Sequence, residues 1–201
     1  MAGVELQSGS LTFDLMGLAD GPAAKPPIWR SMLGCGHEDG LADHESVVLR
    51  LGPHVAAGHS VLPIVRGWME CGQILGAALP QCRAFVWPPA MLAVGAEVFR
   101  ASIRQWVDRS AFPTLSLIAF NRSLDGAIQS TGLAHFTGQE LRLEPPLPWN
   151  AEEAVPVAAI LAGHLALAGR LEKVEAVTAP DGGQIRLEPS ANGRFVRARR
   201  G

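Results

Sequence analysis

The sequence lacks the features that mark an exported or membrane-spanning protein. Its first residues contain neither a basic stretch nor an apolar core, so we expect no signal peptide. The most apolar segment, Val155 to Ala168, is interrupted by Pro156 and His164, and it is shorter than the ~20 residues that span a bilayer. We therefore predict a soluble, cytoplasmic protein with no membrane partner, in which this segment forms a buried helix.

Cysteine is scarce as well. The chain has three cysteines, Cys35, Cys71 and Cys82, and none of their spacings fits a paired zinc or redox motif. An odd number of cysteines also argues against a disulfide framework. We predict that all three are free thiols in a reducing compartment.

Charged residues are few, and the two signs nearly cancel. They make up 18% of the 201 residues, and the formal net charge is -2. Such a chain has no long-range positive electrostatic field that would attract phosphate groups, so we do not expect a nucleic-acid partner. Apolar residues make up 48% of the sequence, which is enough for a folded core, and we predict a single α+β domain over residues 1–201.

Motifs that bind phosphates or activate a nucleophile are absent from the sequence. There is no GxxxxGK[ST] segment, and no GxGxxG follows a strand pattern. There is no GxSxG elbow, and no cysteine lies in a known nucleophile signature. We therefore predict no cofactor.

Hydrophobic periodicity indicates the order of the elements. Strand patterns occur at 4–6, 11–15, 44–51, 82–87, 115–120, 127–130, 141–144, 174–178, 184–188 and 194–197, and helix patterns at 61–79, 97–108 and 150–169. These patterns predict a single mixed, mainly antiparallel sheet with about three helices packed on it, and with 115–120 near its centre. Between the elements, 17–40 is predicted to be a Pro/Gly-rich loop, and 198–201 a frayed basic tail.

The second half of the chain resembles a known bacterial family. The similar pieces are an apolar segment at 112–120, the block STGLAHFTGQEL at 130–141, a helix, and a turn at 181–183. From about Phe112 to Leu187 these pieces resemble the family called Domain of Unknown Function 4261. The resemblance implies a bacterial origin and a shared fold. It implies no activity and no site residue, because none is attached to that family.

The best candidate for a functional site lies between Thr131 and Glu140. A histidine side chain titrates near neutrality, so His135 could act as a general acid or base, with Glu140 orienting it and Thr131 supplying a hydroxyl. A purely structural loop would explain the presence of the same residues. Glycines at both ends can shape turns, and the polar side chains can hydrogen-bond to backbone amides that have no partner in a helix or strand. We favour the structural interpretation and assign no catalytic residue.

Cys35, His37 and His44 form the only other group of possible ligands. These residue types bind soft metal ions, but their spacing matches no zinc motif. We therefore predict no metal site there.

These observations together favour a non-catalytic bacterial protein that binds or regulates another protein inside the cell. Two alternatives stay open. The first is an enzyme of unrecognised type that uses the Thr131 to Glu140 loop, and the second is a small-ligand module with a pocket lined by Trp29, Trp87 or Trp106. The basic cluster Arg194, Arg197, Arg199 and Arg200 is a possible contact for an acidic partner.

Overall fold

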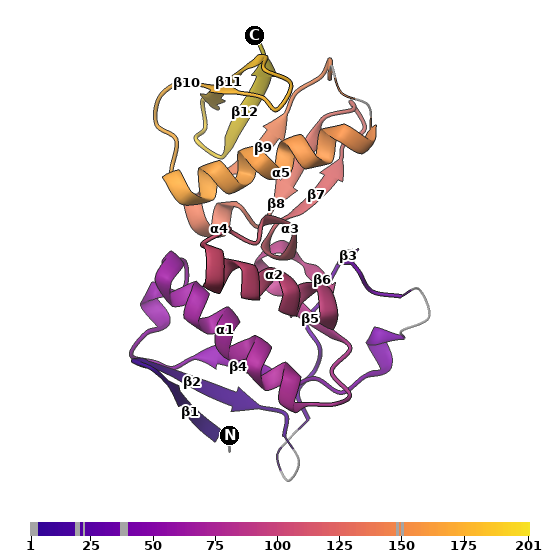
Figure 1. Cartoon of the computed structure of the whole chain (residues 1–201), viewed down its shortest axis with the longest axis vertical. Helices are drawn as coiled ribbons and strands as arrows, with labels where there is room; N and C mark the ends of the chain where they lie inside the picture. Colours follow the sequence, from indigo (N-terminus) through magenta and orange to yellow (C-terminus); the bar gives the residue numbers. More distant parts are fainter. Residues whose placement is uncertain (1–3, 19–20, 22, 37–39, 148, 150) are drawn as a thin grey trace. The chain divides into compact units, whose positions relative to one another are not determined.

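The computed structural model describes residues 4–18, 21, 23–36, 40–147, 149 and 151–201. These residues form an α+β structure with three separate sheets and five α-helices (Figure 1). They divide into two compact units. Unit 1 comprises the described residues within 1–88 and 93–111, and unit 2 comprises 89–92 and the described residues within 112–201.

Unit 1 contains two small sheets and two long helices. One sheet has the order β1-β2-β4 and the other β3-β6-β5. The elements are β1 (Val4–Ser8), β2 (Leu11–Met16), β3 (Ser31–Leu33), the short helix η1 (Leu41–Asp43), β4 (Val48–Leu51), the short helix η2 (Ala56–Gly58), α1 (Leu62–Ala78), β5 (Ala84–Trp87), β6 (Leu92–Gly95) and α2 (Ala96–Arg109). A third short helix, η3 (Pro88–Ala90), follows β5.

A buried apolar cluster around Phe13, Leu51 and Cys71 forms one core of unit 1. Helix α1 also comes close to β5, and a Cβ at Gly76 would lie only 2.3 Å from the ring of Phe85. Any larger residue would displace that ring. The glycine therefore allows the close approach of α1 to Phe85, which stacks on Phe99 of α2.

Unit 2 is built on one six-stranded sheet with the order β10-β11-β12-β9-β8-β7. Neighbouring strands are antiparallel, except that β12 runs parallel to β9. The elements are α3 (Thr114–Leu117), β7 (Ala119–Arg122), β8 (Ile128–Thr131), α4 (Ala134–Thr137), β9 (Glu140–Leu143), α5 (Ala151–Ala168), β10 (Glu175–Thr178), β11 (Gln184–Pro189) and β12 (Phe195–Arg200).

Helix α5 covers one face of this sheet, where it contacts β7, β8 and β9 (Figure 1). Leu161 and Leu165 of α5 are buried in the same core cluster as Leu141 of β9, Ile185 of β11 and Val196 of β12. Because side chains alternate along a strand, the neighbours of these buried residues point to the opposite face. Unit 2 therefore has one apolar face under α5 and one polar face.

The prediction of a single sheet with about three helices is wrong, although the α+β class is confirmed. The three sheets have three, three and six strands. Two of the five helices in the described chain, α3 and α4, have only four residues each. Four residues span barely more than one helical turn, so they give no periodic pattern in the sequence. The prediction of one domain over 1–201 stays a prediction.

The segment 115–120 is not a central strand. Its first residues belong to α3, and the strand that follows, β7, lies at the edge of the sheet. The apolar run has a different cause, because Leu117 is fully buried and Ile118 belongs to the core cluster beside α5. An apolar run of this length predicts burial well, but it does not distinguish a strand from a helical turn.

Two predictions about irregular segments also need correction. Within the predicted loop 17–40, the described residues include strand β3 and a bridge between Ala24 and Ser46. The predicted frayed tail at 198–201 instead largely belongs to β12, which lies between β11 and β9. Its arginines alternate with the buried residues Val196 and Ala198, so a basic composition is compatible with an interior strand.

No helix in the described ranges is long and apolar enough to cross a membrane. Helix α5 comes nearest in composition. It contains Pro156 and packs on the sheet of unit 2. The predicted N-cap of this helix, Asn150, lies outside the described residues.

Candidate functional site

The loop between β8 and β9 contains the residues that the sequence singled out, and two glycines shape it. Gly132 has a φ of +104°, and a Cβ there would lie 2.7 Å from the Cβ of Ala90. Gly138 ends helix α4 with a φ of +74°, in the left-handed region. Side chains other than hydrogen are unfavourable at such φ values, so both positions require glycine.

Glu140 closes this loop with its carboxylate. Oε1 accepts hydrogen bonds from the backbone amides of Gly132 at 2.9 Å and Ala134 at 3.2 Å. Oε2 accepts one from the amide of Leu133 at 3.2 Å and one from the hydroxyl of Ser130. These donors include the amides at the start of α4, which have no partner within the helix. The carboxylate therefore acts as a cap for α4 and ties it to β8.

Gln139 is a second polar anchor that the sequence analysis missed. Its side chain is 1% exposed. Its Nε2 donates to the carbonyl of Leu171 at 3.2 Å, and its Oε1 accepts from the amide of Leu171 at 2.8 Å. This pairing fastens the loop to the connection between α5 and β10. Its only sequence signal is a glutamine between Gly138 and Glu140, which does not distinguish a buried amide from an exposed one.

His135 packs against aromatic neighbours. Its ring meets Phe136 edge to face, with centroids 5.0 Å apart, and Phe136 meets Phe112 in the same way at 5.4 Å. Thr131, the third candidate, is half-buried at the end of β8 and lies opposite Ala119 of β7. The two carboxylate oxygens of Glu140 together accept four hydrogen bonds, so this carboxylate is poorly placed to act as a general base. These contacts agree with the structural interpretation of the loop, which stays a prediction.

The possible metal ligands do not converge in the described structure. The thiol of Cys35 lies 3.8 Å from the carbonyl oxygens of Leu33 and Ala93. His44 Nδ1 lies 3.2 Å from the carbonyl of Gly40. His37 lies outside the described residues. No group of three or more His, Cys, Asp or Glu side chains among the residues placed by the structure could hold a metal ion.

Cys35, Cys71 and Cys82 all lie in the described part of the chain, and none of them forms a disulfide there. Burial raises the pKa of the Cys71 thiol, and the nearby charge of Glu70 raises it further. Burial also raises the pKa of Cys82, with a smaller opposing effect from Arg100. A raised thiol pKa lowers the fraction of reactive thiolate at neutral pH.

We therefore expect slow labelling of Cys71 and Cys82 in the folded protein and rapid labelling of all three cysteines after denaturation. Titration with a thiol reagent, in the absence of reductant, measures both rates. Fewer than three thiols in denatured monomer would contradict the prediction. Equal rates for folded and denatured protein would contradict the role assigned to burial.

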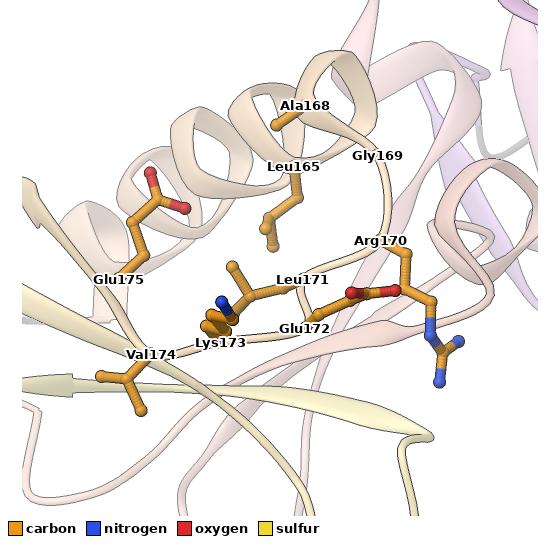
Figure 2. A pocket seen from close by; sticks show the side chains of 9 residues that line it. All are labelled: Leu165, Ala168, Gly169, Arg170, Leu171, Glu172, Lys173, Val174 and Glu175. Carbon is orange, nitrogen blue, oxygen red and sulfur yellow. The ribbon is translucent and has the colours of Figure 1, made fainter.

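A pocket of about 400 Å³ lies at the end of α5 (Figure 2). Leu165 and Leu171 point toward each other inside it, while the side chain of Arg170 points away. The other lining residues are Ala168, Gly169, Glu172, Lys173, Val174 and Glu175. None of the three tryptophans considered for a ligand pocket is among them. Trp87 and Trp106 are buried, and Trp87 packs edge-on against Trp68.

Arginines gather on the face of the six-stranded sheet opposite α5. We call this surface the open face; it is formed by Arg142, Glu144, Arg186, Glu188, Arg197 and Arg199. Arg142 lies directly opposite Arg197 in the strand register, and Arg186 lies directly opposite Arg199. Like charges placed opposite each other on neighbouring strands are destabilising. The open face therefore holds two such pairs side by side.

Two glutamates partly neutralise these arginines. Glu144 lies between Arg142 and Arg197, with N···O distances of 3.3 Å and 3.5 Å. Glu188 lies 3.9 Å from Arg186. Arg142 also pairs with Asp125 in the turn before β8, and hydrogen bonds from Ser123 and Ala127, together with Arg142, lower the pKa of that carboxyl. The pair Arg186 and Arg199 is compensated least.

The chain matches no protein-family model, no curated protein and no solved structure. These comparisons neither support nor contradict the resemblance to Domain of Unknown Function 4261, which stays a prediction.

Proposed function

We propose that this protein is a non-catalytic intracellular module that binds an acidic surface of another protein through its open face. The observation that carries the proposal is the cross-strand pair Arg186 and Arg199, beside the pair Arg142 and Arg197. Carboxylates of a partner would relieve the repulsion within each pair. Binding would thus recover a free-energy cost that the free protein bears.

A protein partner fits this surface better than a nucleic acid. Glu144 and Glu188 lie among the arginines, so a continuous row of phosphates would meet carboxylates as well as guanidinium groups, whereas the carboxylates of a folded partner can be spaced to meet the arginines alone. The formal net charge of -2 also provides no general attraction for polyanions. Arginine forks instead bind carboxylates in a bidentate manner, which selects position as well as charge.

The hydrogen bonds that the Glu140 carboxylate accepts support a non-catalytic role for this protein. This carboxylate accepts hydrogen bonds from three backbone amides and one hydroxyl, and these bonds hold α4 in place. General acid-base chemistry needs an accessible group within hydrogen-bond reach of a substrate. The residues that looked most catalytic in the sequence are thus better explained as parts of the fold.

The proposal is tested by quantitative affinity capture with purified protein as bait. The test variant is Arg186→Ser/Arg199→Ser, and the matched control is Arg104→Ser/Arg109→Ser, which removes the same charge from the exposed side of α2. We expect a salt-sensitive protein partner that the wild type and the control retain and that the test variant loses by at least tenfold. Equal capture by both variants, or tight binding of a single-stranded oligonucleotide at physiological salt, would contradict the proposal.

A further inference from the structure

The charged residues of the open face form a regular pattern across β9, β12 and β11. Arg142 of β9 lies directly opposite Arg197 of β12, and Arg197 lies directly opposite Glu188 of β11. All three lie on the face away from α5, because the buried residues of these strands alternate with them. From β9 to β11, this first row therefore reads arginine, arginine, glutamate.

The second row carries the same charges in reverse order. Arg199 follows Arg197 by two residues on β12 and lies directly opposite Arg186 of β11. On β9 the next residue of the open face is Glu144, whose backbone amide donates to the carbonyl of Ala198 at 2.9 Å. From β9 to β11, this row reads glutamate, arginine, arginine. The two rows together form an approximately two-fold pattern of charge with two equivalent arginine pairs.

The two arginine pairs offer two separate positions for an anion. Their midpoints differ by two residues along β12 and by one strand spacing across it, which corresponds to about 8 Å. Glu188 ends the first row and Glu144 begins the second, so a carboxylate lies beside each pair. A ligand with negative charge at two separate points fits this pattern, whereas a ligand with continuous negative charge must pass a glutamate.

Glu144 and Glu188 lower the positive charge of the open face. Its four arginines and two glutamates give a net charge of +2, which would be +4 without the glutamates. The side chain of Glu144 is only 15% exposed, and its oxygens lie near the Nε atoms of Arg142 and Arg197. Because affinity for a single-stranded nucleic acid rises with the number of phosphates that cations neutralise, both glutamates oppose such binding.

We propose that Glu144 and Glu188 are specificity determinants that keep nucleic acids and other extended polyanions off the open face. This role rests on the proposed function, since the same arginines bind the acidic protein partner. Specificity of this kind depends on a repulsive element placed among attractive ones. A partner with carboxylates at two separate positions avoids the glutamates, and a chain of evenly spaced phosphates does not.

Binding of a fluorescently labelled oligothymidylate, measured by fluorescence anisotropy at low salt, tests this role. The test variant is Glu144→Gln/Glu188→Gln. The matched control is Glu153→Gln/Glu172→Gln, which changes the net charge equally at two exposed residues outside the open face. We expect the test variant to bind about tenfold more tightly than the control, with an affinity that falls steeply as salt is added. Equal binding by the two variants would overturn the role of the glutamates and leave the capture of a protein partner unaffected, whereas tight binding by the wild type at physiological salt would contradict both proposals.

Further variants locate the gained binding and control for folding. Adding Arg186→Ser/Arg199→Ser to the test variant should return oligonucleotide binding to within about twofold of the wild type. Binding that persists would lie elsewhere on the protein and would overturn the proposal. Thermal melts accompany each variant, because Glu144 bridges two arginines and its loss can lower stability. Glu188→Gln alone removes only a contact of 3.9 Å and should still strengthen binding about threefold, so a folded single variant with no gain would also contradict the proposal.

Discussion

Replacing Ile118 with aspartate is expected to prevent unit 2 from folding. Ile118 is 1% exposed and belongs to the core cluster beneath α5. No counter-charge is available within that apolar cluster, and an unpaired charge there costs several kcal/mol, which is comparable with the whole stability of a domain. Loss of soluble protein, or loss of the cooperative thermal transition of unit 2, is the expected result.

The matched control for this experiment is Leu115→Asp. Leu115 lies three residues before Ile118, in the same apolar run, but its side chain is partly exposed. We expect this variant to remain soluble, with a change in stability of less than about 1 kcal/mol. A soluble Ile118→Asp variant with an unchanged melt would show that this part of the core does not support the unit.

Replacing Glu140 with alanine is expected to give the second largest effect. The substitution leaves the amides of Gly132, Leu133 and Ala134 without their acceptor and removes the partner of the Ser130 hydroxyl. Since Glu140 is partly exposed, water replaces some of these contacts. We expect a loss of about 2 kcal/mol, or a melting temperature lower by roughly 4–8 °C.

His135→Ala is the companion variant, and it should change the melting temperature much less. A folded protein often accepts strain or uncompensated charge at a functional site, and removing such groups then raises stability. If Glu140→Ala and His135→Ala both melt above the parent in the same buffer, the structural interpretation of this loop is wrong. The loop would then become the first place to search for an activity.

Long helices were the most predictable part of the fold. The predicted helix at 97–108 and the observed α2 differ by one residue at each end, because its apolar residues recur with a helical period. Helix α5 ends at Ala168, one residue before the glycine that was expected to stop it. Short elements were not predictable in the same way. Helix α4 depends on the Glu140 cap rather than on any pattern of its own.

The candidate sites were harder to predict than the helices, because they depend on contacts between residues that are far apart in the chain. The sequence contained the arginines, but only the strand register places Arg186 opposite Arg199 and Arg142 opposite Arg197. Similarly, the pairing of Gln139 with Leu171 joins two segments that are far apart in the chain. Glu140 was easier to anticipate, since it closes a loop whose glycines lie close to it in sequence.

The position of β12 has a consequence for how the chain folds during synthesis. This strand is the last of the sheet in chain order, yet it lies between β9 and β11. While the ribosome is still translating α5, β10 and β11, the edge of β9 that later pairs with β12 has no partner strand. Pairing that must await a distant segment is slow, and unpaired strand edges favour aggregation. The interval before β12 pairs with β9 is therefore when we expect the nascent chain to be most prone to aggregation.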